Sequence, residues 1–293
     1  MKQKYAIIGC GRSGKAFARQ LSSAGYVPSG FASRRLASAR QAADLAGYQG
    51  GQVSERPEAV IGDADIILIS TPDGAIGQTA SEMADRGGMK PGATVFHLSG
   101  ALSSTELSSL KKAGVQTGSI HPLQSFGSGD AGKNPFDGIM MGIEGDREAV
   151  ETGWRMAADL GAVPFEIDTT GKMLYHASAV AASNYLVTLM KFAMDLLGES
   201  GVAEDRRFAV LKPLIMGTLG NIERTGPVDA LTGPIVRGDT AIVRAHLEVI
   251  GRDAPQMLSL YKTLGKYTVD IAAEGGGISG EKKHELLSVL SDA

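Results

Sequence analysis

The chain has 293 residues, of which 43% are hydrophobic and 21% charged, and its formal net charge is −3. These values exclude a disordered chain, and the lack of a basic surplus argues against a nucleic-acid or anionic-membrane partner. The single cysteine, Cys10, excludes an intrachain disulfide and a cysteine-rich zinc site, so no metal site is expected.

The first half of the chain alternates short apolar runs with helical patterns. Strands are predicted at 5–9, 27–32, 64–70, 94–98, 116–120, 139–143 and 163–167. Helices are predicted at 15–24, 36–46, 76–86, 104–113 and 147–160. Strands and helices that alternate in this way are joined by right-handed crossovers. The pattern therefore predicts an α/β fold with a doubly wound parallel sheet covered on both faces.

After Asp168 no further strand is predicted. Helical patterns recur at 172–198, 203–219, 240–250, 254–274 and 280–290. The prediction is a nucleotide-binding domain at 1–167 followed by an all-helical domain at 168–293. The apolar stretch 174–197 carries two charged side chains, Lys191 and Asp195, which a membrane span rarely does. We therefore expect a buried helix in a cytoplasmic protein.

A glycine-rich loop follows the first predicted strand and opens the first helix. It consists of Gly9, Cys10, Gly11, Arg12, Ser13 and Gly14, which fit the pattern G-x-G-x-x-G. In this context Gly9 makes the tight turn, Gly11 lets the backbone approach a pyrophosphate, and Gly14 allows close helix packing. The helix N-terminus then favours the phosphates. The loop predicts a Rossmann-like dinucleotide site, with a ligand-free glycine turn as the alternative and with Cys10 packing rather than acting as a nucleophile.

The end of the second predicted strand indicates which dinucleotide is bound. An acidic residue about 20 residues past the loop usually binds the ribose 2′-hydroxyl of NAD. Here the strand ends in Ser33, Arg34 and Arg35, without a carboxylate. Ser33 can donate to a 2′-phosphate and Arg34 can pair with it, with Arg35 as a helper. The sequence favours NADP, unless these arginines only begin a solvated helix.

Polar groups also follow later strands, at the sheet edge where α/β proteins bind ligands. Ser70-Thr71-Pro72 is expected to border the ribose and nicotinamide. His121 is the first candidate for proton transfer, because histidine titrates near neutral pH. Ser99 is the candidate orienting hydroxyl, and His97, which lies inside a strand, is interpreted as structural.

The helical half contributes further candidates. His176 lies in the predicted long helix and is either a catalytic group or a core histidine, and Asn184 either binds substrate or braces a helix. A loop rich in Gly and Pro carries Thr232 and Arg237 as candidate substrate contacts. Arg237 would bind a substrate carboxylate or pair with Asp239.

Seven segments together resemble one bacterial family that joins a Rossmann-like domain to a C-terminal domain of unknown function. They read GCGRSG, SRR, STPD, HLSGAL, SIHPLQSF, YHASAVAASNY and ALTGPIVRGD. The resemblance implies a C-terminal domain like that of 6-phosphogluconate dehydrogenase, often a dimerisation element. The family is similar to pyrroline-5-carboxylate reductases, β-hydroxyacid dehydrogenases and deazaflavin-dependent NADP reductases.

Two comparisons within that group bear on the site residues. His121-Pro122-Leu123 resembles a segment of prephenate dehydrogenases whose histidine assists hydride transfer, which favours His121 with Ser99 beside it. The sequence departs from those enzymes after Leu123. The β-hydroxyacid dehydrogenases place a catalytic Lys and an Asn on the interdomain helix, but the spacing from Lys172 to Asn184 is not theirs.

The sequence thus predicts an NADP-dependent oxidoreductase that transfers a hydride to or from a small carbonyl, imine or hydroxy-acid substrate in an interdomain cleft. His121 would be the acid–base group, and Ser99, His176 and Asn184 would assist. The alternatives are a non-catalytic NADP-binding sensor or scaffold, and a fold that uses another nucleotide or none. The expected assembly is a homodimer formed through the helical domain.

Overall fold

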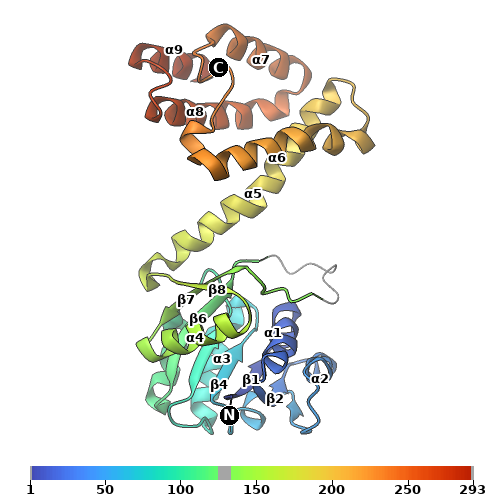
Figure 1. The fold of residues 1–293 in the computed structure, drawn as a ribbon, viewed down its shortest axis with the longest axis vertical. Coiled ribbons are helices and arrows are strands. Elements are labelled where there is room, and N and C mark those ends of the chain that lie inside the picture. The colour runs from blue at the N-terminus through green and yellow to red at the C-terminus, as the bar shows by residue number, and fades with distance from the viewer. Residues whose placement is uncertain (1, 125–132, 292–293) are drawn as a thin grey trace. The chain divides into compact units, whose positions relative to one another are not determined.

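The computed structural model describes residues 2–124 and 133–291 (Figure 1). The chain divides into two compact units, Met1–Ala182 and Ser183–Ala293. The division falls within helix α5 (Lys172–Glu199), later than the predicted boundary, because the first turn of α5 packs on the sheet of the first unit.

The first unit is built on one eight-stranded sheet of order β3-β2-β1-β4-β5-β6-β7-β8. The strands are β1 (Lys4–Ile8), β2 (Val27–Ala32), β3 (Val53–Ser54), β4 (Ile66–Ile69), β5 (Thr94–His97), β6 (Gln116–Pro122), β7 (Met140–Gly145) and β8 (Val163–Glu166). All neighbouring strands are parallel except β6 and β7. The order 3-2-1-4-5-6 is that of a Rossmann sheet, so the predicted fold class is confirmed.

Helices connect these strands and cover the sheet. They are α1 (Arg12–Ser23), α2 (Leu36–Leu45), η1 (Pro57–Ala59), α3 (Asp73–Arg86), η2 (Ser104–Ala113), α4 (Arg147–Asp159) and η3 (Thr169–Gly171), where η marks a 3-10 helix. The central strand β4 is apolar and buried throughout, as a parallel strand between two helical layers must be. In α1 the buried residues Gly14, Phe17, Ala18 and Leu21 recur at helical spacing and form its core-facing stripe.

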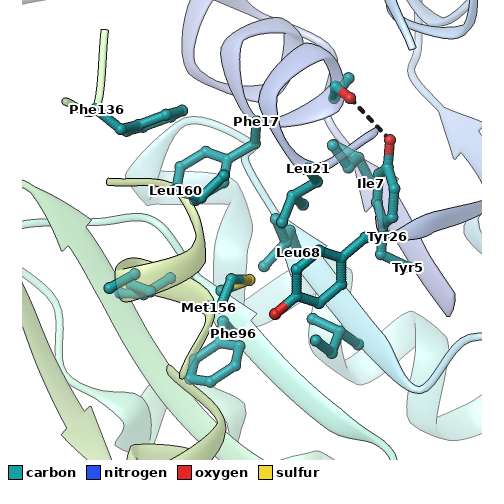
Figure 2. Packing of buried hydrophobic residues seen from close by; sticks show 14 of the residues in the cluster. Tyr5, Ile7, Phe17, Leu21, Tyr26, Leu68, Phe96, Phe136, Met156 and Leu160 are labelled. Carbon is teal, nitrogen blue, oxygen red and sulfur yellow. Dashed lines mark hydrogen bonds between the residues drawn. The ribbon is translucent and has the colours of Figure 1, made fainter. Parts of the chain in front are cut away.

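Two hydrophobic clusters lie on opposite faces of the sheet. One joins α1, α2 and α4 to it; Figure 2 shows part of this cluster, with Phe17 from α1 and Met156 from α4. In the same cluster the buried Tyr5 hydroxyl donates a hydrogen bond to Ala18 O at 2.8 Å and lies 2.9 Å from Ser22 Oγ. The other cluster joins α3 and η2 to the sheet through residues such as Met83 and Leu107. Because helices cover both faces of the sheet, a ligand can reach it at the ends of the strands.

The second unit is helical in its described residues. It contains α6 (Glu204–Asp229), α7 (Thr240–Asp253), η4 (Pro255–Met257), α8 (Leu258–Glu274), α9 (Gly280–Ser291) and the C-terminal part of α5. Its core is formed by Val243, Val269, Leu286, Val289 and Leu290. Helix α6 continues beyond the predicted end at residue 219, with a kink at Gly226, where φ is +79°.

The expectation that the long apolar helix is buried is wrong within the single chain. Only Lys172 of α5 is buried, and Leu174 and Val187 are 79% and 69% exposed. Among the described residues, one segment, Thr169–Glu199, is long and apolar enough to cross a membrane by composition, with a mean hydropathy of 1.2. The same helix carries an ion pair between Lys191 and Asp195. Its apolar surface is uncovered in one chain.

Candidate functional site

The carboxyl ends of four neighbouring strands carry most of the predicted site residues. In the order β1, β4, β5 and β6, these ends lead into the glycine loop, Ser70-Thr71-Pro72, Ser99-Gly100 and His121. The four strands are parallel, so their ends lie at the same edge of the sheet. This is the edge at which open α/β sheets bind ligands.

The glycine loop is shaped by close backbone contacts. Gly9 has φ +90°, donates its N–H to Ala32 O at 2.8 Å, and would place a Cβ only 2.6 Å from the Ser70 carbonyl. A Cβ on Gly14 would collide with Gly9 O. At Gly11 a Cβ would meet nothing within 4 Å. Gly9 and Gly14 are thus fixed by the fold, whereas Gly11 faces open space of the kind that a pyrophosphate needs.

Helix α1 begins at this loop with free backbone donors. No side chain caps its N-terminus at Gly11, and no acidic residue lies in its first turn, which starts with Arg12 and Ser13. Such an end attracts an anion. Cys10 is buried, and burial raises the pKa of its thiol to about 12, which agrees with packing and not with a nucleophile.

The end of β2 presents positive charge to solvent. Arg34 and Arg35 are exposed, and within the described part of the chain no ion pair engages either guanidinium. Arg35 occupies the N-cap position of α2, and the Ser33 N–H donates to Ser54 O at 3.0 Å. The Ser33 side chain and both guanidinium groups remain available to a ligand phosphate.

One buried polar atom at the end of β4 has no partner. Thr71 Oγ1 is inaccessible to solvent and makes no hydrogen bond in the structure. Ser70 donates its N–H to Ile8 O at 2.7 Å, and Pro72 is the N-cap residue of α3. An unpaired buried hydroxyl is costly, so Thr71 fits a site that a bound polar ligand completes.

His121 at the end of β6 is hydrogen-bonded to the first turn of α5. Its Nδ1 lies 2.8 Å from the Tyr175 hydroxyl oxygen, and the two rings meet edge to face with centroids 5.7 Å apart. Burial, followed by the positive charge of Lys172, lowers the pKa of His121 to about 4. Burial also raises the pKa of Tyr175 to about 12. At neutral pH both groups are therefore uncharged.

Gly100 allows His121 and His176 to approach the backbone. A Cβ at Gly100 would lie 2.7 Å from His121 Nε2 and 2.9 Å from His176 Cδ2. The structure thus brings together the predicted residues His121 and His176 around a glycine. Because Tyr175 is hydrogen-bonded to Nδ1, Nε2 is the ring nitrogen of His121 that is left for another partner.

Ser99 and His97 organise the turn that carries Gly100. Ser99 Oγ accepts hydrogen bonds from the N–H groups of Ala101 and Leu102, at 3.1 and 3.0 Å. His97 is fully buried; its Nδ1 accepts the Ser99 N–H at 3.2 Å, which leaves Nε2–H to donate to Ser103 O at 3.0 Å. Burial lowers the pKa of His97 to about 4. His97 is thus a neutral core histidine.

The other predicted site residues belong to the second unit. Asn184, Thr232 and Arg237 all have exposed side chains. The pairing of Arg237 with Asp239, one of the two interpretations from sequence, does not occur among the described residues; Asp239 instead caps α7 by accepting the Ile242 N–H. Their roles as substrate contacts remain predictions. Within residues 2–124 and 133–291, no group of three His, Cys, Asp or Glu side chains could hold a metal ion.

Two family models match successive parts of the chain, and the second of them extends across the division between the two units. Residues 1–122 match the model of a Rossmann-like domain, and residues 139–268 match the model of a domain of unknown function, DUF2520. The chain combines a Rossmann-like domain with a DUF2520 domain. No curated protein sequence matches it significantly.

Solved structures share the fold over almost the whole chain. A provisionally named NADP oxidoreductase from Bacteroides fragilis is 22% identical, with a TM-score of 0.70 and coverage of 92% of this chain and 98% of that one. Protein TM1727 from Thermotoga maritima is 25% identical, with the same TM-score and coverage. A reductive aminase from Aspergillus terreus, in complex with NADPH and ethyl levulinate, is 17% identical, with a TM-score of 0.60 and coverage of 99% and 93%.

Sequence reasoning missed several residues that complete the site. Tyr175 is not among the residues predicted for the site, yet its hydroxyl is hydrogen-bonded to His121 Nδ1. In the first unit, Lys172 and Glu144 are each 1% exposed and lie 4.0 Å apart. A signal for Glu144 existed, because it is a lone charge within an apolar strand. Its partner, far along the chain, could not be inferred without the fold.

Proposed function

We propose that this chain is an NADP-dependent oxidoreductase that transfers a hydride between nicotinamide and a small carbonyl, imine or hydroxy-acid substrate. One observation carries the proposal: a single sheet edge holds a glycine loop open at Gly11 and, farther along, the hydrogen-bonded pair His121–Tyr175. The shared fold of a reductive aminase solved with NADPH supports it. The non-catalytic alternative is distinguished by experiment below.

The chain's own groups fit the cofactor. The loop Gly9–Gly14 and the N-terminus of α1 would hold the pyrophosphate, and Thr71 would gain a partner beside Ser70 and Pro72. Ser33, Arg34 and Arg35 would bind a 2′-phosphate, because among the described residues no side-chain ion pair engages the two arginines. Bound NADPH supplies the hydride.

His121 is the proposed acid–base group. As a neutral imidazole it has one N–H and one lone pair, and Tyr175 occupies its Nδ1, which leaves Nε2 for substrate. With Tyr175 as the donor to Nδ1, Nε2–H donates to a carbonyl oxygen or imine nitrogen during reduction. With Nδ1–H as the donor, Nε2 accepts the hydroxyl proton during oxidation. Ser99 shapes the turn beside it, and His176 lies across Gly100.

The first experiment measures binding of NADPH and NADH by calorimetry. We expect the protein to bind NADPH more tightly than NADH. The Arg34→Ala variant should have an affinity for NADPH that is about 10- to 100-fold lower and an affinity for NADH that is little changed, because only NADPH carries the 2′-phosphate. Arg40→Ala is the matched control, since Arg40 is another exposed arginine of α2. If neither nucleotide binds, the oxidoreductase proposal fails.

The second experiment tests turnover with a panel of carbonyl, imine and hydroxy-acid substrates. Oxidation of NADPH with any member, lost in His121→Ala but retained in His284→Ala, supports catalysis; His284 is an exposed histidine of the helical unit. NADPH binding without turnover of any member would favour the sensor or scaffold alternative.

We further propose that a second copy of the chain covers the exposed apolar surface of the second unit. On α6 the exposed large apolar side chains are Phe208, Val210, Leu214, Met216, Leu219 and Ile222. Monomeric proteins rarely expose so continuous an apolar surface. The Lys191–Asp195 pair on α5 favours a protein partner over lipid.

Light scattering after size exclusion tests the dimer. We expect a dimeric wild type, and a shift toward monomer in Leu214→Glu, which puts a charge on a side chain that is 70% exposed in one chain. Lys212→Glu, also exposed on α6, is the control and should remain dimeric. A monomeric wild type, or one that needs detergent to stay in solution, would contradict the proposal.

A further inference from the structure

Lys172 is a buried charge to which the proposed reaction gives no role. The residue is 1% exposed, and its ammonium donates to Ser119 Oγ and lies 4.0 Å from Glu144 Oε1. The Glu144 carboxylate also accepts hydrogen bonds from Ser104 N–H, Ser104 Oγ and Thr169 Oγ1, at 2.8, 2.8 and 2.9 Å. A buried ion needs such partners, and an unpaired one would be costly.

This network holds the start of α5 where apolar packing is weak. Met173 and Leu174, which follow Lys172, are 61% and 79% exposed. Through Ser119 and Glu144, Lys172 ties α5 to strands β6 and β7. One helical turn later, Tyr175 lies on the same side of α5, with its ring centroid 5.8 Å from Lys172 Nζ and its hydroxyl 2.8 Å from His121 Nδ1.

We propose that Lys172 is a positioning residue whose buried ammonium, held by Ser119 and Glu144, fixes Tyr175 against His121 and disfavours a positive charge on His121. The inference rests on the proposed role of His121 in proton exchange. It concerns the geometry and charge around the imidazole, which exist without cofactor or substrate.

The charges that act on His121 come from two helices. From α5, Lys172 and His176 lower the pKa of His121, and from α3, Asp73 raises it. Tyr175, also on α5, is uncharged because burial holds its pKa at about 12. Burial lowers the pKa of Lys172 to about 8 even though Glu144 raises it, so the ammonium is still charged over the whole range in which His121 titrates.

The test is the pKa of His121, measured by NMR of histidine-labelled full-length protein, with His121→Asn used to assign the signal. In Lys172→Met we expect the pKa to rise by about one pH unit, because a like charge has been removed. Glu144 retains three hydrogen-bond donors in this variant. Lys191→Met is the control, since Lys191 is an exposed, paired lysine of the same helix.

The Glu144→Gln variant distinguishes an effect of the Lys172 charge on the pKa of His121 from an effect of a loosened structure. It leaves the ammonium without its counter-ion, so the pKa of His121 should stay low or fall. Water entering a loosened site would instead raise that pKa in both variants, and an equal rise in both would overturn the proposal. So would an unchanged pKa in a folded Lys172→Met variant.

Lys172→Gln is the second variant, because it keeps a donor for Ser119 without the charge; we expect the pKa of His121 to rise in it as well. If neither Lys172 variant folds, the proposal is overturned, because Lys172 would then be required for folding and not for positioning Tyr175. If the protein turns over a substrate, the pH profile of kcat/KM should shift with the pKa of His121. A failure to bind NADPH would defeat the proposed function but leave the NMR result intact.

Discussion

Lowering the pH from 7 to 4 should destabilise the Rossmann-like domain, because the folded state disfavours protonation of the His97 ring. Both ring nitrogens are already used by the neutral form: Nδ1 accepts the Ser99 N–H, and Nε2–H donates to Ser103 O. Protonation would put a second donor in front of the Ser99 N–H. The ring is fully buried, so no water can stabilise the new charge.

The pKa values set the size and the pH range of the effect. Burial lowers the pKa of His97 from 6.5 to about 4. Between these values the unfolded chain binds a proton that the folded chain does not, so stability falls as the pH falls from 6.5 to 4. At about 1.4 kcal/mol per pH unit, the full loss is about 3 kcal/mol. A domain with a typical stability of about 5–15 kcal/mol would show this clearly.

Urea unfolding at pH 7, 6, 5 and 4 gives the necessary comparison between wild type and His97→Asn. Asparagine does not titrate, and its Oδ1 can accept the Ser99 N–H. The variant will be less stable at pH 7, but we expect its stability to fall less steeply toward pH 4. Trp154 is the only tryptophan and lies on α4, so its fluorescence follows the Rossmann-like domain.

We compare how steeply the free energy of unfolding falls with pH in wild type and in His97→Asn, because other titrating groups contribute equally to both slopes. His121 titrates in the same range but is present in both proteins. Carboxylates whose pKa is lowered, such as Asp146, begin to lose their stabilising effect as the pH approaches 4, but they are present in both proteins. His284→Asn should keep the wild-type slope, because His284 is exposed. Equal slopes in wild type and His97→Asn would refute the reasoning.

Three further predictions follow from single positions. Gly11→Ala should leave the melting temperature unchanged but abolish NADPH binding, whereas Gly9→Ala should cost about 2–4 kcal/mol in urea unfolding, because Gly9, unlike Gly11, combines a φ of +90° with a backbone clash. Gly100→Ala should lower kcat about 100-fold with little change in NADPH affinity, because its Cβ would displace His121. The free energy of unfolding should rise between pH 8 and 10, because burial lowers the pKa of Lys172 from 10.5 to about 8. In this range the unfolded chain still holds a proton that the folded chain has released, so stability increases with pH. Urea unfolding of Lys172→Met should not show this rise.

Most of the first unit could be predicted from hydrophobic periodicity, because its strands and helices are each a local pattern. The apolar run of β4 and the amphipathic stripe of α1 were both recognisable in the sequence. The two-residue strand β3 was missed because it is too short to show alternation. The predicted helix at 104–113 is a 3-10 helix, η2, a difference that residue spacing does not reveal.

The long helix shows where periodicity fails. Its boundaries, Lys172–Glu199, were predicted closely, but its burial was predicted wrongly. An apolar composition shows that a surface needs cover and does not identify what provides it. In the described part of a single chain Leu174 and Val187 are 79% and 69% exposed, and the composition of the helix alone does not predict what covers them.

The two halves of the sheet differ in how readily their chemistry could be inferred from sequence. At β1 the candidate site consists largely of backbone, with Gly9 and Gly11 making the approach, so a six-residue pattern identifies it. At β5, β6 and β7 it depends on buried side chains that meet from distant segments, as Lys172 meets Glu144. A backbone site requires only that certain side chains be absent, and glycines record that locally. A charged network requires partners that only the fold brings together, so the contacts of Lys172 with Glu144 and of Tyr175 with His121 became evident only from the structure, whereas His121 itself was predicted from the sequence.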